Sequence, residues 1–78
     1  MRKAIEQDTL KALIETASLR EIQCTRGPGS EGFVLSARLA GNWLPIRSKR
    51  ESIRIWASLT AIGKFCEKMG IKHLTVEL

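Results

Sequence analysis

The fold is decided by residues 58–71, which read SLTAIGKFCEKMGI. Apolar side chains recur there at the spacing of one helix face, namely Leu59, Ile62, Phe65, Cys66 and Met69. Ser58 stands where an N-cap residue belongs, and Gly70 suits the left-handed residue that follows a helix. Ile71 can pack back on Cys66, as this type of helix end requires. The stretch therefore predicts an amphipathic helix with one face against a core.

Strands are predicted on both sides of this helix, because apolar and polar residues alternate there. After the helix, every second residue is apolar: Leu74, Val76 and Leu78. Before it, the alternation places Ile53 and Ile55 on the inner side, with Arg54 and Trp56 facing outward. A charged turn at residues 48–51 separates this strand from the one before it.

A hairpin is predicted further upstream, where Gly41 and Asn42 suit a tight turn. The first strand has its inward side chains at alternate positions: Phe33, Leu35, Ala37 and Leu39. Its outward side chains are Val34, Ser36 and Arg38. The returning strand points Leu44 and Ile46 inward, and points outward Trp43, Pro45 and Arg47. Since proline donates no ladder hydrogen bond, this strand is expected at an edge or with a bulge.

The first third of the chain adds one helix and one strand. The helix is predicted from apolar residues at helical spacing, Ile5, Leu10, Leu13, Ile14 and Ala17, with Asp8 at its cap or in its first turn. The strand is predicted over residues 20–25, where Ile22 and Cys24 alternate with polar residues. Residues 27–32 hold three glycines and a proline, which predicts a loop between strands.

These elements predict the α+β class, in the order α-β-β-β-β-α-β. We expect a mainly antiparallel sheet with two helices packed on one face. The 78 residues allow one domain, residues 1–78, because a chain of this length buries only roughly 60% of its unfolded surface. No apolar run approaches the roughly 18 residues of a membrane span, and no secretory h-region begins the chain, so we expect a cytoplasmic protein with no membrane partner.

The residues that carry chemistry are few. His73 is the single histidine and Asp8 the single aspartate, and the acidic residues are scattered singly. Cys24 and Cys66 fall on the apolar sides of their elements, which indicates small buried side chains rather than metal ligands. We therefore expect no enzyme, no catalytic residue, no metal and no cofactor.

Positive charge gathers in the middle of the chain. The net charge is +5, and residues 36–56 contain five cations against one anion. Seven residues become candidates for binding nucleic acid or a partner: Arg38, Trp43, Arg47, Lys49, Arg50, Arg54 and Trp56. The cations suit phosphates and the indoles suit base stacking, which predicts a DNA-binding sheet face. Two alternatives remain open: the tryptophans pack structurally, or the face docks a protein or a second copy of the chain.

Residues 53–77, together with Arg20-Glu21-Ile22, resemble the small ParC-like partition-associated proteins of plasmids and integrative elements. The shared features are an arginine and an aromatic residue before a Ser-Leu helix start, and a closing Gly-Ile. The resemblance implies an accessory role in maintaining a plasmid or another mobile element, with DNA or a partition ATPase as partner. It implies no catalytic residues.

Overall fold

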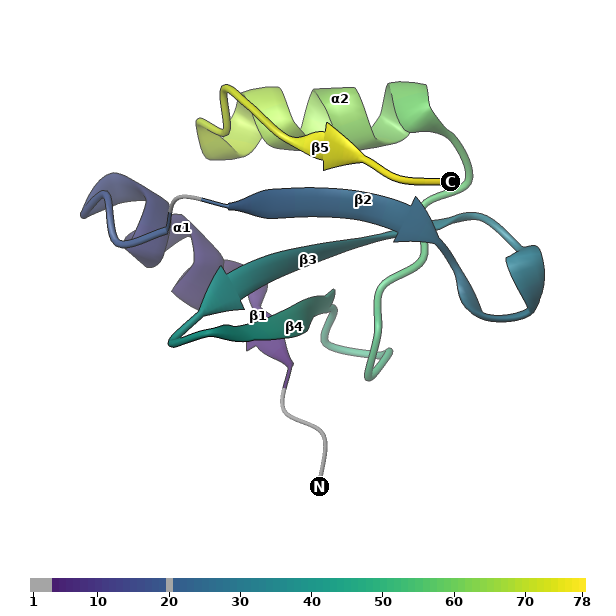
Figure 1. Cartoon of the computed structure of the whole chain (residues 1–78), viewed down its shortest axis with the longest axis horizontal. Coiled ribbons are helices and arrows are strands. Elements are labelled where there is room, and N and C mark those ends of the chain that lie inside the picture. Colours follow the sequence, from purple (N-terminus) through teal and green to yellow (C-terminus); the bar gives the residue numbers. More distant parts are fainter. Residues whose placement is uncertain (1–3, 20) are drawn as a thin grey trace.

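The computed structural model describes residues 4–19 and 21–78. Two helices and a five-stranded sheet make up the domain (Figure 1). The helices are α1 and α2, Gln7–Glu15 and Leu59–Met69. The strands are β1 to β5, namely Ile5–Glu6, Ile22–Arg26, Phe33–Leu39, Asn42–Arg47 and Thr75–Val76. A short 3₁₀ turn, Pro28–Ser30, lies between β2 and β3.

The sheet has the strand order β1-β4-β3-β2-β5. Its three longer strands pair antiparallel, β2 with β3 and β3 with β4. The two short edge strands pair parallel, β1 with β4 and β5 with β2. The predicted α+β class and the mainly antiparallel sheet are therefore confirmed. The predicted hairpin is confirmed, with Arg38 opposite Trp43, but its turn lies one residue earlier than predicted. Leu39 is opposite Asn42, so the turn residues are Ala40 and Gly41, both with positive φ, and Asn42 belongs to β4.

The core lies between the sheet and the two helices. On the sheet side it contains alternate residues of the strands, namely Ile5, Cys24, Leu35, Ala37 and Ile46. The helices contribute Leu10, Ile62, Phe65, Cys66 and Met69, so the predicted stripe of α2 faces the sheet apart from its exposed first residue, Leu59. Cys24 and Cys66 are both buried and free, as predicted.

The ends of α2 are also as predicted. The Ser58 side chain accepts a hydrogen bond from the backbone N–H of Ala61 at 3.1 Å. Gly70 has a φ of 83°, and the N–H of Ile71 donates to the Cys66 carbonyl at 2.9 Å. A serine cap and a left-handed glycine thus bound the helix, because they satisfy backbone groups that the helix leaves unpaired.

The start of the chain differs from the predicted single helix. Ile5 belongs to β1, where it lies opposite Ile46, and α1 begins only at Gln7 with Asp8 in its first turn. Neither helix of the described residues is long and apolar enough to cross a membrane. Arg20, the predicted beginning of β2, lies outside the described residues.

The predicted strand at residues 53–56 is the main difference. This segment makes one isolated bridge, in which Trp56 and Phe33 exchange two backbone hydrogen bonds of 2.8 Å. The N–H of Arg54 donates to the Ile46 carbonyl at 2.8 Å. The segment therefore runs from β4 to the first residue of β3 without a continuous ladder. Since no ladder enforces the alternation, the predicted sides are wrong: Trp56 is buried and Ile55 is exposed.

The glycine-rich loop explains how this segment fits. Gly32 has a φ of 63°, and a methyl group added there would lie 2.6 Å from both the Ile55 side chain and the Trp56 carbonyl oxygen. The N–H of Gly27 donates to the Gly32 carbonyl at 3.0 Å and closes the loop. Glycine is thus required at position 32 by its backbone conformation and by the close approach of the segment before α2.

Candidate functional site

The sheet has a second face, turned away from the two helices. We define the outer face by the strand residues on that side: Gln23, Thr25, Val34, Ser36, Arg38, Trp43, Pro45, Arg47 and Thr75. They alternate with the core residues along β2 to β5, because successive side chains of a strand point to opposite faces. Three of these residues are apolar, Val34, Trp43 and Pro45, and the others are polar or charged.

Trp43, the second residue of β4 and next to the hairpin turn, has 39% of its surface exposed on this face. Its side chain lines two shallow hollows, one on either side. The first hollow, of about 360 Å³, is also lined by Val34, Pro45 and Ile53. The second, of about 340 Å³, has equally polar and apolar walls and is also lined by Glu21, Ile22, Gln23, His73, Leu74, Thr75 and Glu77. An exposed indole between two hollows is a contact point that a partner can cover.

The cations of the outer face have acidic neighbours. The guanidinium of Arg38 lies 3.5 Å from the carboxylate of Glu21, and both side chains are about half exposed. Arg47 lies directly opposite Glu6 in the pairing of β4 with β1. The exposed Arg38–Glu21 pair stabilises the fold by only about 0–1 kcal/mol, but it does reduce the positive charge offered to an anion. The outer face is therefore mixed in charge rather than strongly basic.

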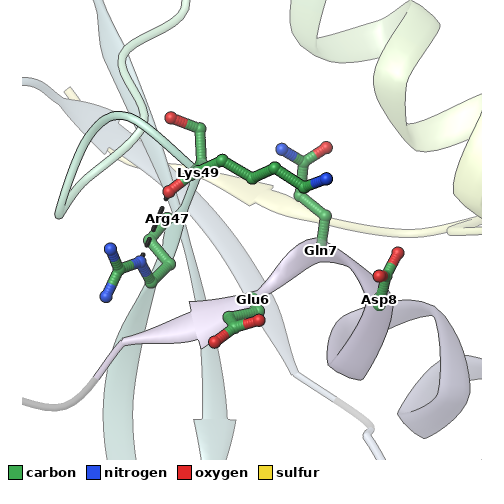
Figure 2. Close-up of a pocket in the computed structure, with 6 residues that line it drawn as sticks. Glu6, Gln7, Asp8, Arg47 and Lys49 are labelled. Atoms are coloured by element: carbon green, nitrogen blue, oxygen red, sulfur yellow. Dashed lines mark hydrogen bonds between the residues drawn. The ribbon is translucent and has the colours of Figure 1, made fainter.

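A third hollow, of about 450 Å³, lies where β4 ends beside β1 and the start of α1. Its lining again combines both signs, with Arg47 and Lys49 near Glu6 and Asp8. Figure 2 shows the Lys49 side chain reaching toward Gln7 and Asp8, while the Arg47 guanidinium points to the opposite side. The Nε–H of Arg47 donates to the Ser48 carbonyl at 3.3 Å.

Arg54 and Trp56 do not lie on the outer face, which corrects the prediction that placed them there. Trp56 is 3% exposed and packs on Phe65 of α2, with ring centres 5.0 Å apart. The Arg54 guanidinium stacks over both rings, 4.6 Å from Trp56 and 5.3 Å from Phe65. It also donates a 3.0 Å hydrogen bond to the side chain of Gln7. These two residues join α2 to the start of α1.

The predicted set is thus divided among three places. Arg38, Trp43 and Arg47 lie on the outer face; Lys49 and Arg50 are exposed in the turn after β4. Arg54 and Trp56 belong to the core side. Sequence reasoning missed the apolar and polar partners of Trp43, above all Ile53 and His73. For Val34 and Pro45 the alternation along their strands was a sufficient signal, since it places both beside Trp43 on one face.

The titratable groups of the described residues offer little reactive chemistry. Burial raises the pKa of the Cys24 and Cys66 thiols, and the pKa of Cys66 is raised further by the nearby Cys24. A raised pKa keeps a thiol protonated and unreactive. Within residues 4–19 and 21–78, no three histidine, cysteine or acidic residues lie close enough to hold a metal ion.

Comparisons with family models, curated proteins and solved structures found no match to this chain. The relationship to partition-associated proteins therefore stays a prediction. Three of the features behind it have folding roles in this domain, because Ser58 caps α2, Gly70 ends it and Trp56 fills the core beneath it.

Proposed function

We propose that the domain is a non-enzymatic docking module that binds a protein partner through the outer face, with Trp43 as its anchor. The observation that carries the proposal is the exposed Trp43 indole between two hollows on a sheet face that no helix of the described residues covers. Tryptophan is enriched among the few residues that dominate binding energies at protein interfaces, especially near their centres.

The charge pattern favours a protein over a nucleic acid as partner. Phosphate binding depends on cations that can replace the counterions of the backbone. On the outer face Arg38 is paired with Glu21, and Arg47 lies beside Glu6. Arg54, another of the predicted phosphate-binding cations, stacks on Trp56 and Phe65 instead of lying on the outer face. Mixed charge around exposed apolar side chains is an ordinary composition for a docking surface.

The two hollows indicate what the partner presents. One apolar side chain fits the hollow lined by Val34, Pro45 and Ile53. On the other side of Trp43, Glu21 and Glu77 accept hydrogen bonds or attract a cation. A segment with an apolar residue near a lysine or arginine meets both requirements. By the resemblance drawn from the sequence, a partition ATPase is a candidate source of such a segment.

DNA binding is the second candidate function. It is favoured by one observation, that Lys49 and Arg50 are both exposed in the turn after β4, next to Arg47. The net charge of +5 adds to their attraction for phosphates. In this case the protein is a DNA-binding accessory of plasmid or mobile-element maintenance, as the resemblance implies.

A peptide selection tests the docking proposal. A displayed peptide library is selected on the immobilised protein, and the affinity of the enriched peptides is measured by calorimetry. We expect Trp43→Ala to weaken binding about thirtyfold or more, the size of a hot-spot loss of about 2 kcal/mol. Leu59→Ala is the matched control, since Leu59 is equally apolar, 44% exposed, and lies on α2 in the other layer. Equal binding by the Trp43→Ala protein contradicts the proposal.

A salt titration tests the DNA candidate. Fluorescence anisotropy of a labelled duplex is measured at about 50 and 200 mM salt, where affinity for each phosphate contact falls with a log–log slope of roughly −0.9. If DNA is the partner, binding drops steeply with salt and is reduced in the Lys49→Ala/Arg50→Ala variant. Absence of binding at the lower salt concentration removes this candidate.

A further inference from the structure

The β5 strand leaves one edge of the sheet open. Among the described residues it pairs only with β2, through Thr75 and Val76, and it lies at the end of the strand order (Figure 1). The N–H of Glu77 donates to the Cys24 carbonyl on β2 at 2.9 Å. Because successive backbone groups of a strand alternate in direction, the N–H and carbonyl of Val76 point away from β2. Those groups are free to pair with another strand.

Two apolar side chains accompany the open edge. Val76 is 47% exposed and Leu78 is 73% exposed, the largest exposed fractions among the large hydrophobic residues described. Natural sheets protect such edges with lysine, proline or bulges, since an unprotected edge pairs with other chains. Residues 73–78 contain neither lysine nor proline. The protection of this edge is limited to the shortness of β5, which has two residues, and to the charges of Lys72 and Glu77.

Two copies of this edge have complementary side chains when they pair antiparallel, but not when they pair parallel. Residues 72–78 read KHLTVEL. An antiparallel pair centred on Thr75 places His73 of each copy opposite Glu77 of the other, and Leu74 opposite Val76. The imidazole N–H can then donate to the carboxylate. A parallel pair instead places Glu77 beside Glu77, where like charges oppose pairing. The order of these residues thus selects an antiparallel arrangement.

We propose that two copies of this chain form a dimer by antiparallel pairing of their β5 strands about a two-fold axis through Thr75. In this two-fold arrangement the β5 edge of each copy is paired with that of the other, and Val76 is covered. The two sheets join into one, so both outer faces, each with its Trp43, lie on the same side. The proposal rests on the β5 edge and does not require the docking function, although His73 and Glu77 also line the hollow beside Trp43.

Sedimentation equilibrium tests for the dimer. The protein is measured over concentrations from about 10 to 500 µM, because the dimer fraction rises with protein concentration by mass action. We expect His73→Glu, which sets the new carboxylate against Glu77 of the other copy at two symmetric places, to weaken the dimer about tenfold. The exchange variant His73→Glu/Glu77→His restores the pairing with the residues reversed. Thr9→Glu, an exposed change on α1, adds a negative charge away from β5 and leaves the dimer unchanged.

Each outcome decides the proposal. A dimer that His73→Glu weakens and the exchange variant restores supports it. A monomer at every concentration overturns it, and so does a dimer that is indifferent to both His73→Glu and Val76→Lys, since the contact then lies elsewhere. Circular dichroism of each variant serves as the control that the variant is folded. The Trp43→Ala protein is expected to dimerise normally, so failure of the docking function and failure of the dimer are distinguishable.

Discussion

Trp43 and Trp56 are expected to differ sharply in what they contribute to stability. Trp56 is 3% exposed and is in contact with Phe65 and Arg54, whereas Trp43 is 39% exposed on the outer face. Removing a buried tryptophan costs about 3–5 kcal/mol through lost transfer energy and the cavity left behind. At Trp43, where much of the ring is already in water, we expect about 1–2 kcal/mol.

These magnitudes decide whether each variant folds. A domain of 78 residues has a free energy of unfolding of about 4–12 kcal/mol, at 0.05–0.15 kcal/mol per residue. Trp56→Ala therefore removes a large part of the stability, while Trp43→Ala leaves the domain folded. Trp56→Phe should cost only about 1 kcal/mol. It keeps an aromatic ring on Phe65 and removes the buried Trp56 Nε1–H, which has no hydrogen-bond partner within the described residues.

Urea unfolding followed by circular dichroism measures all three free energies on one scale. The expected order of destabilisation is Trp56→Ala, then Trp43→Ala and Trp56→Phe close together. If Trp43→Ala costs as much as Trp56→Ala, the assignment of one tryptophan to the core and the other to the outer face is refuted.

Three further predictions concern the loop, the thiols and the stacked arginine. Gly32→Ala should lower the free energy of unfolding by about 2–3 kcal/mol, and Gly29→Ala by only about 1 kcal/mol. Both positions have a positive φ, but only at Gly32 would the added methyl group clash with neighbouring atoms. Equal urea midpoints for the two variants would contradict this prediction. The pKa of Cys24 and Cys66 is raised by burial above the ordinary 9.0. The folded state therefore holds these thiol protons more tightly. The resulting stability is complete below pH 9.0 and is lost as pH rises through the folded pKa values. Urea midpoints between about pH 8 and 10.5 should fall more steeply for the wild type than for a Cys24→Ala/Cys66→Ala variant, and parallel curves would contradict the prediction. Arg54→Ala should cost about 1–2 kcal/mol from lost stacking and one lost hydrogen bond, measured by thermal unfolding, and a cost near zero would mean that the stack contributes nothing.

The sequence was sufficient for elements whose signals are local. The cap at Ser58, the apolar stripe of α2 and the glycine at position 70 all act within a few residues of one another, and all were predicted. The same holds for the presence of the hairpin and for the outward direction of Trp43, because period-two alternation is reliable where a strand has a continuous ladder.

The side chains of residues 53–56 could not be placed in that way. This segment is held by isolated contacts, with Arg54 bonded to β4 and Trp56 to β3, so alternation along it carries no information about facing. The partner that holds the Arg54 side chain is Gln7, 47 residues away in the chain. Contacts of that range leave no periodic signal in a single sequence. For this reason the predicted binding set joined residues from both sides of the sheet.

The claim that Trp43 anchors a protein partner is tested most directly by the fluorescence of Trp43 itself. The chain has two tryptophans, so Trp56→Phe leaves Trp43 as the single emitter. Saturating this variant with a selected peptide should shift the emission maximum to shorter wavelength and reduce quenching by acrylamide, because the indole leaves water. Intact peptide binding with unchanged emission and quenching would contradict the account, since the partner would then bind without covering Trp43.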